Sequence, residues 1–322
     1  MAPFPSLVNV ITRTISLKKD KSYGKDNDAR KVVEAMAKEA RKNEMLISSS
    51  GIVKSSKSNN FSCVFTKKGQ KGFNQDRLIV WEENLAEKSL EMDFKMETNH
   101  KYDIWKQSYI KTFAAIDQDL KQHTGIDSFQ SGTTALTVIK QGEYLIIANV
   151  GDSRAVLATT SDNGTLTPTQ LTTDLKPNLP KEAERIMESK GRVFCMEDEP
   201  GVYRVWMPNG KTPGLAISRA FGDYCVKDFG LISVPDVTQR KLTSMDQFVI
   251  LATDGVWDVI SNQAAIKIVG STPNREKAAE RLVKCATHEW KRKRKGIAID
   301  DISAICLFFH SASSHATTKV VE

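Results

Sequence analysis

The stretch Phe248–Val259, FVILATDGVWDV, carries the pattern on which the fold and the function of this chain depend. Its first part, FVILAT, is rich in β-branched and aromatic residues, which predicts a buried strand. Asp254 ends this run and Gly255 follows it. A carboxylate at a rigid strand end, beside a glycine that leaves room, is well placed to hold an ion and ordered water. The stretch therefore predicts both a core strand and a polar site at its end.

Further aspartates have the same context, beside an apolar run: Asp76 before RLIVWE (77–82), Asp152 after YLIIANV (144–150) and a glycine, and Asp300 and Asp301 before ISAICLFF (302–309). Any one of them alone would more often be a turn residue or a helix cap. Together they favour one shared site at the edge of a sheet system. Carboxylate oxygens without neighbouring Cys or His select Mg²⁺ or Mn²⁺ rather than zinc.

Other segments predict the elements that surround these strands. SCVFT from Ser62 and RAVLAT (154–159) are strand-like, and helical spacing predicts four helices: Asp103–His123, Pro180–Lys190, Asn262–Val269 and Arg275–Arg292. The first helix has a buried face formed by Tyr109, Phe113, Ile116 and Leu120, and the last has an inward stripe formed by Ala279, Leu282, Ala286 and Trp290. Many strands with helices between them predict an α+β domain with the helices packed outside the sheets.

The two ends of the chain differ in composition from this region. Residues 1–60 are expected to be an extension, with a helix from Asn27 to Leu46 and a Ser/Lys/Asn-rich linker over 48–60. Residues 61–310 would form the folded domain. The polar tail 311–322 is expected to be disordered.

The formal net charge is +7, and the tract Lys291–Lys295 (KRKRK) contributes to it. A solvated basic face at a helix end is the favoured interpretation, and a nuclear-localisation or anionic-surface patch is the alternative. No nucleic-acid-binding motif accompanies the tract, so a nucleic-acid partner is not expected. The five cysteines form no CxxC pair, which fits a reducing compartment. None is followed six positions later by Arg, which excludes the thiolate–arginine loop of tyrosine phosphatases.

Targeting signals are not evident in the sequence. No apolar run approaches the ~18 residues of a membrane span. The N-terminal segment is interrupted by Pro and Arg, unlike a secretory signal, and Ala2 stands where N-myristoylation needs glycine. The expected location is intracellular, in the cytoplasm, the nucleus or both.

Several blocks occur in a fixed order: KGFNQD (71–76), SGTTA (131–135), ANVGDSRAV (148–156), DLKPNLPKEAERI (174–186), GLAISRAFGDY (214–224), ISVPDV (232–237), LATDGVWDV (251–259) and DDIS (300–303). They resemble the signature blocks of protein phosphatase 2C, and most of all a plant growth-regulating clade with a similar N-terminal extension. The resemblance implies a central β-sandwich of two antiparallel sheets flanked by helices. It also implies hydrolysis of phosphoserine and phosphothreonine by a metal-activated water, without a covalent phosphoenzyme.

The resemblance also implies roles for the aspartates, with Mg²⁺ or Mn²⁺ as the cofactor. Asp254 and Asp300 would ligate one catalytic ion, and Asp76 would hold the water network of the metal. Asp152, together with Asp254, matches the pair that binds a third, weaker ion.

Two positions near the first block depart from the pattern of many relatives. Gln75 stands where many relatives have Glu, which weakens a second-ion role there. Lys71 stands where some relatives use Arg to bind the substrate phosphate. Lysine keeps the charge but lacks the bidentate fork of arginine.

One family block is missing. Relatives carry a strand that ends in Asp-Gly-His-Gly, whose Asp bridges both catalytic ions, whereas residues 83–102 here contain no Asp-Gly pair and no apolar strand. Replacement by Glu82, Glu83 or Asp93 is not favoured, because a bridging ligand must be held rigidly. The fold would lack one strand and one helix of the family. The chain would bind at most one metal ion tightly. An impaired phosphatase is expected, and a catalytically silent binding protein or splice isoform is the alternative.

The expected partners follow from this assignment. They are phosphoprotein substrates, with kinases as further candidates, and the chain is expected to be a monomer.

Overall fold

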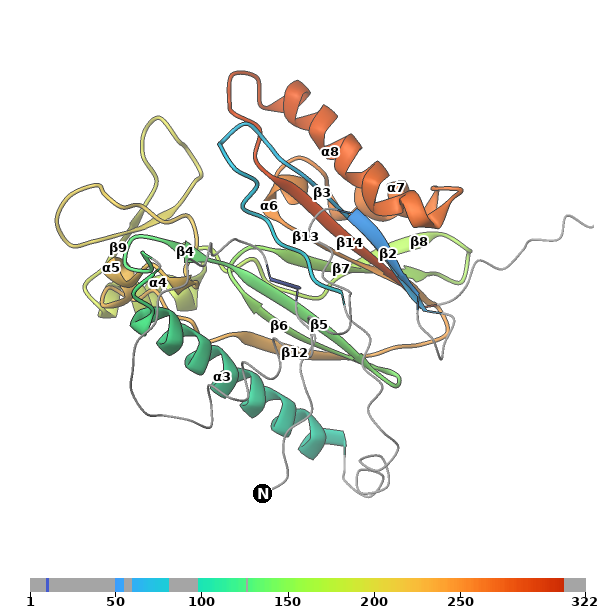
Figure 1. Cartoon of the computed structure of the whole chain (residues 1–322), viewed down its shortest axis with the longest axis horizontal. Coiled ribbons are helices and arrows are strands. Elements are labelled where there is room, and N and C mark those ends of the chain that lie inside the picture. Colours follow the sequence, from blue (N-terminus) through green and yellow to red (C-terminus); the bar gives the residue numbers. More distant parts are fainter. Residues whose placement is uncertain (1–9, 12–49, 55–59, 81–97, 126, 310–322) are drawn as a thin grey trace, which may run out of the picture.

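Two antiparallel sheets packed face to face form the centre of the structure (Figure 1). The computed structural model describes residues 10–11, 50–54, 60–80, 98–125 and 127–309. The larger sheet has the order β2 (Ser50–Lys54), β3 (Phe61–Lys67), β14 (Ile302–Phe308), β13 (Asp246–Ala252), β7 (Arg154–Thr160) and β8 (Leu166–Gln170). The smaller has the order β1 (Val10–Ile11), β5 (Ala135–Gln141), β6 (Tyr144–Val150) and β12 (Asp236–Lys241). The expected β-sandwich is confirmed.

Strand β13 shows why the central strands are apolar on both faces. Its side chains alternate between two buried layers, as a strand period of two requires. Val249 and Leu251 lie in the layer between the two sheets. Phe248, Ile250 and Ala252 lie in the layer under the outer helices. Because both faces are covered, the sequence is continuously apolar rather than alternating.

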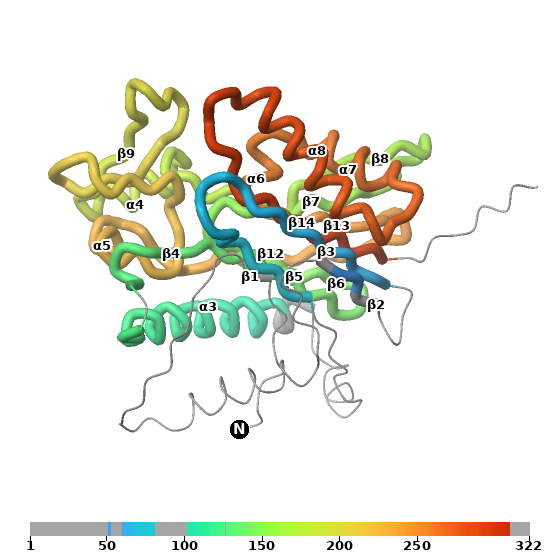
Figure 2. Tube along the Cα trace, turned by 45° about the horizontal axis from the view of Figure 1, so that its top comes forward, coloured from blue at the N-terminus to red at the C-terminus, as the bar shows by residue number. Residues whose placement is uncertain are grey.

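Helices cover the outer face of each sheet (Figures 1 and 2). Helices α7 (Asn262–Gly270) and α8 (Ala278–Lys293), joined through the 3₁₀ turn η2 (Arg275–Lys277), pack on the six-stranded sheet. Helix α3 (Thr98–Gln122) packs on the four-stranded sheet. The inward stripe predicted for α8 is confirmed, since Ala279, Leu282, Ala286 and Trp290 are all buried.

Short elements beside the sandwich complete the described part of the chain. They are the helices α4 (Pro180–Glu188), α5 (Tyr224–Lys227) and α6 (Asp254–Trp257) and the paired strands β9 (Arg192–Phe194) with β10 (Arg204–Trp206) and β4 (Gly132–Thr133) with β11 (Phe221–Gly222). Within the described ranges, no helix is both long and apolar enough to cross a membrane.

Three expectations about local structure need correction. The strand predicted over RLIVWE is wrong for residues 77–80, which pair with no other strand in the described ranges. Leu78 is buried in the core between the sheets all the same. An apolar run becomes a strand only where a partner backbone is available, and the sequence does not show whether one is.

The linker expected over 48–60 contains strand β2, which pairs with the edge of β3. Helix α3 begins at Thr98, five residues before the predicted start. The predicted helix from Asn27 to Leu46, the tail 311–322 and residues 81–97 lie outside the described residues.

Candidate active site

The turn after β13 is where the site is built. Thr253 leads into the short helix α6, whose first residue is Asp254. A Cβ atom on Gly255 would lie 2.1 Å from the backbone oxygen of Asp301, so only glycine lets this turn pack against the start of β14. The indole Nε1 of Trp290 donates to the Gly255 oxygen at 2.7 Å. Packing from two elements therefore fixes the position of Asp254.

The carboxylate of Asp254 lies among other acids. Burial raises its pKa well above the ordinary value, and the negative charges of Asp152 and Asp300, followed by Asp258 and Asp76, raise it further. Within the described residues, no side chain or backbone donor forms a hydrogen bond or ion pair with this carboxylate. A buried carboxylate that accepts no hydrogen bond and lies among other acids favours a cation.

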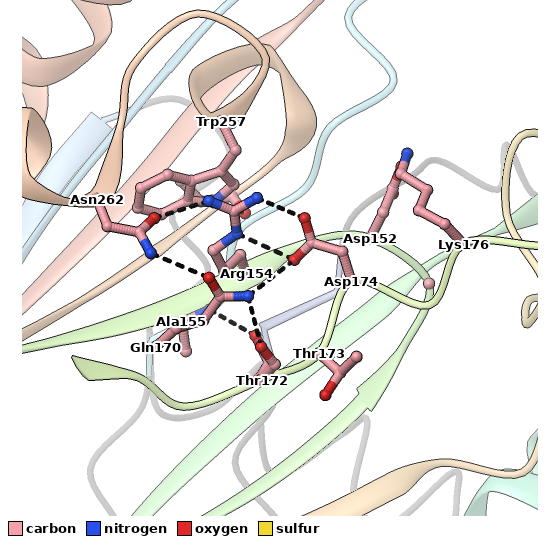
Figure 3. Close-up of polar contacts among 12 residues, drawn as sticks. Asp152, Arg154, Ala155, Gln170, Thr172, Thr173, Asp174, Lys176, Trp257 and Asn262 are labelled. Carbon is pink, nitrogen blue, oxygen red and sulfur yellow. Dashed lines mark hydrogen bonds and ion pairs between the residues drawn. The ribbon is translucent and has the colours of Figure 1, made fainter. Parts of the chain in front are cut away.

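Two lysines neutralise part of this acidic cluster. Lys71 Nζ lies 2.6 Å from Asp300 Oδ2, and Lys176 Nζ lies 2.5 Å from Asp152 Oδ2. Figure 3 shows Lys176 beside Asp152. Burial alone would lower the pKa of Lys176, but the charges of Asp152 and Asp254 raise it instead. Two predicted metal-ligand positions thus have a lysine ammonium as their present partner.

Asp76 and Asp301 connect the first block to the strand ends. Thr253 Oγ1 donates to Asp76 Oδ2 at 3.0 Å. Burial raises the pKa of Asp76, and the neighbouring charges of Asp301 and Asp300 add to the effect, against hydrogen bonds from Ser303 and Thr253. Asp301 accepts from the backbone N–H groups of Gly69 at 2.8 Å and Gln75 at 2.6 Å. Asp301 therefore fixes the loop that carries Lys71 and Asp76.

A second network holds the segment that carries Lys176 (Figure 3). Arg154 Nε and Nη2 donate to the two carboxylate oxygens of Asp174 at 3.0 and 2.5 Å. Its Nη1 donates to Asn262 Oδ1 at 2.7 Å, and its guanidinium lies 5.1 Å from the ring centroid of Trp257. This bidentate pair ties Asp174, two residues before Lys176, to strand β7 and to helices α6 and α7.

The structure brings the predicted site residues Asp76, Asp152, Asp254, Asp300 and Lys71 into this one region. Across the described ranges, however, no three Asp, Glu, His or Cys side chains come close enough to share one metal ion. Sequence reasoning missed Asp258 and Lys176. The signal for Asp258 was available, because it lies one helical turn after Asp254, whereas nothing in the sequence indicated that Lys176 would reach Asp152.

Comparison with known proteins identifies the family. The model of the family described as "Protein phosphatase 2C" matches residues 19–292. The chain belongs to the protein phosphatase 2C family. Members of this family are serine/threonine protein phosphatases that depend on a metal, generally Mg²⁺ or Mn²⁺.

Relatives of known sequence match nearly the whole chain. "Probable protein phosphatase 2C 73" of Arabidopsis thaliana is 49% identical over 358 aligned positions, which cover 97% of this chain and 96% of the relative. "Probable protein phosphatase 2C 34" of the same plant is 50% identical over 357 positions, covering 98% of this chain and 99% of the relative. These matches confirm the resemblance to plant 2C phosphatases.

Solved structures support the fold. The crystal structure of serine-threonine phosphatase 2C from Toxoplasma gondii has a TM-score of 0.69 and 21% identity, with 82% of this chain and 100% of that chain covered. At this level of identity the likeness concerns the fold and not the details of the site.

Proposed function

We propose that this member of the family binds one Mg²⁺ or Mn²⁺ ion tightly, through Asp254 and Asp300, and hydrolyses phosphoserine and phosphothreonine only slowly. Asp76 would order water beside the ion, and Asp152 would contribute to a weaker ion position. The observation that carries the proposal is the carboxylate of Asp254, which lies among four other acids and forms no hydrogen bond or ion pair within the described residues. The nearby ammonium of Lys176 pairs with Asp152 instead.

The donor chemistry fits a hard divalent cation in part. All the candidate ligands are carboxylates, as Mg²⁺ and Mn²⁺ prefer. Burial and the charges of Asp152 and Asp300 raise the pKa of Asp254, and a bound cation would offset both effects. Lys71 and Lys176 would have to move from Asp300 and Asp152 to admit ions there. When bound, the metal would offset phosphoryl charge and lower the pKa of a water. The protein side chains would bind and orient the substrate, with Lys71 beside its phosphate group.

Slow turnover follows from the missing Asp-Gly-His-Gly segment. An alignment of 358 positions with a chain of 322 residues leaves at least 36 positions without a residue of this chain. The second relative gives a nearly equal length. The lack of a partner strand beside residues 77–80 in the described ranges agrees with a missing strand. Without the aspartate of that segment, a second catalytic ion would lack its principal ligand.

A catalytically silent binding protein is the second candidate. The ion pairs Lys71–Asp300 and Lys176–Asp152 favour it, because they supply positive charge where the family binds metal. Such a chain would keep its contacts with phosphoproteins or kinases without turnover. In either case we propose a monomer whose catalytic domain spans residues 61–310, after an extension over 1–60 that contributes the edge strands β1 and β2.

The decisive experiment compares this chain with a version in which the relatives' segment carrying Asp-Gly-His-Gly is inserted after Glu82. Both are assayed with a phosphothreonine peptide in Mn²⁺, and calorimetry counts the bound ions. We expect the repaired chain to be at least ~100-fold faster, since removing one stabiliser of transition-state charge costs ~3 kcal/mol or more.

The number of bound ions and the rate of turnover distinguish the impaired phosphatase from the silent binding protein. One ion with slow turnover supports the impaired phosphatase. No detectable ion and no turnover in the original chain favour the silent binding protein. Equal rates with two ions in both chains would overturn the proposal, because another carboxylate would then serve as the bridge.

A further inference from the structure

A groove between helices α7 and α8 lies outside the acidic site. It has a volume of about 520 Å³. Its apolar lining comes from the end of the α6 turn and from α7: Val259, Ile260, Ala264 and Ile268. The first two are buried, and the other two are partly buried and pack on the core under the helices. Such a groove has room for an apolar side chain of a ligand.

Cationic side chains from α8 line the same groove. Arg281, Lys284 and Lys293 contribute to its wall, together with the exposed His288. Of the guanidinium nitrogens of Arg281, Nη1 alone makes hydrogen bonds within the described residues. Lys284 pairs with Glu280 at 2.6 Å, but its side chain is 65% exposed, and such surface pairs are weak.

The single acid in the groove lining is already paired. Glu289 lies 2.6 Å from Arg292 and 3.2 Å from Lys293. The rest of the basic tract 291–295 continues the positive charge beyond the groove. The rim therefore carries a clear excess of positive charge above an apolar floor.

We propose that this groove, lined by residues of α7 and α8, docks an acidic amphipathic peptide segment of a protein partner. An apolar anchor side chain of the segment would fill the floor, and its acidic residues would face Arg281 and Lys284. This is the helix-in-groove or anchored-peptide mode of recognition, with charge complementarity at the rim. A flat anionic surface could pair with the basic side chains of the rim but would leave the apolar floor unfilled. A basic rim together with an apolar floor therefore favours a peptide.

The groove is physically connected to the acidic site. Val259 follows Asp254 by five residues, and its backbone oxygen accepts from Lys293 Nζ at 2.6 Å. Trp290, on the same helix, donates to Gly255. A segment docked here would hold its protein close to the turn that carries Asp254. Binding itself does not require catalysis, so the proposal stands apart from the activity proposed above.

The test measures binding to the full chain. The probe is a fluorescein-labelled amphipathic peptide of ~16 residues, with Leu at helical spacing and Glu elsewhere. Fluorescence anisotropy gives its Kd for the unaltered chain, for Arg281→Gln/Lys284→Gln and for Ala264→Trp, which fills the floor. The matched control is Lys106→Gln/Lys111→Gln, two exposed lysines on α3 at the other side of the sandwich.

We expect the charge variant to weaken binding about fivefold, as the loss of two surface ion pairs would. Ala264→Trp should weaken it at least as much, and the α3 control should leave Kd unchanged. Thiol alkylation read by mass spectrometry localises the peptide independently of any variant. Cys285 lines the groove and should be protected, whereas Cys195, also partly exposed, lies near β9 and should not be.

Three results would overturn the proposal. The first is equal binding of a Glu-only peptide without Leu, which would show that the apolar floor is not used. The second is equal Kd for all variants, with Cys285 unprotected. The third is binding of phosphatidylserine vesicles or duplex DNA through Arg281 and Lys284 while the peptide does not bind, which would assign the surface to another class of partner.

Discussion

Two carboxylates of this protein, Asp254 and Glu182, have opposite electrostatic surroundings. Glu182 on α4 is 3% exposed and accepts hydrogen bonds from Arg185, Arg219 and Ser218, at 2.6 to 3.0 Å. Burial would raise its pKa, but these donors lower it to about 2. Asp254 has other aspartates as its neighbours, and its pKa is raised.

The difference separates a carboxylate whose partners the protein itself supplies from one that we propose binds an ion. The protein itself completes the surroundings of Glu182, so that removal of its charge should cost stability. Asp254 accepts no hydrogen bond within the described residues and lies among other acids, so that removal of its charge should relieve repulsion. Buried charges are stabilising only when they are paired and hydrogen-bonded, and an unpaired one indicates a ligand position.

The largest effect on stability is expected for Glu182→Gln. The variant leaves Arg185 and Arg219 without their shared partner, so the free energy of unfolding at pH 7 should fall by about 2–3 kcal/mol. Because the folded-state pKa is about 2 and the ordinary value is 4.5, the folded state binds fewer protons between these values. The contribution of Glu182 is therefore complete above pH 4.5 and is lost as the pH falls toward 2.

Denaturant unfolding at several pH values checks this prediction. Glu184→Gln, at an exposed position of the same helix, is the matched control and should change little. An equal effect of the two variants would show that the arginine network adds nothing to stability.

A smaller effect of opposite sign is expected for Asp254→Asn in the metal-free protein. Relief of repulsion among the aspartates should raise the free energy of unfolding by about 1 kcal/mol. Because the folded-state pKa is raised, the folded state binds more protons than the unfolded one just above the ordinary value of 3.8. The unaltered protein should therefore gain stability through this group as the pH falls from 7 toward that value.

Melting temperatures in chelator at several pH values measure both parts of this prediction, and melting temperatures in Mn²⁺ then locate the ion. Mn²⁺ should stabilise the unaltered chain and Asp162→Asn, in an exposed turn, but not Asp254→Asn. Asp254→Asn should also lose any residual phosphatase activity. Equal stabilisation of Asp254→Asn by Mn²⁺ would place the ion elsewhere.

The smallest effect is expected for replacement of the basic tract Lys291–Lys295 by Gln. All five side chains lie at exposed positions, beyond the buried stripe that ends at Trp290. We expect the melting temperature to change by less than ~2 °C, as for surface substitutions in general. Any residual activity should not change. A much larger fall would show that the contact of Lys293 with Val259 anchors α8 and that a charge outside the buried networks also contributes to stability.

The sequence by itself determined the positions of most central strands along the chain and the placement of aspartates at their ends. Both follow from local rules, since an apolar run of strand length must be buried and a polar residue directly after it must lie at the sheet edge. The order of the family blocks added the identity of the family. For the same reason the inward stripe of α8 and the buried face of α3 could be predicted from periodicity.

Only the tertiary structure decided how the charges are compensated. Lys71 and Asp300 are 229 residues apart in the chain, and Gly69 and Asp301 are 232 apart, yet each pair is in contact. No periodicity or composition reports such contacts. The same holds for RLIVWE and for strand β2, because strand formation needs a free neighbouring backbone as well as a suitable sequence. Local patterns determine which residues are buried, and long-range packing determines which partner each buried charge has.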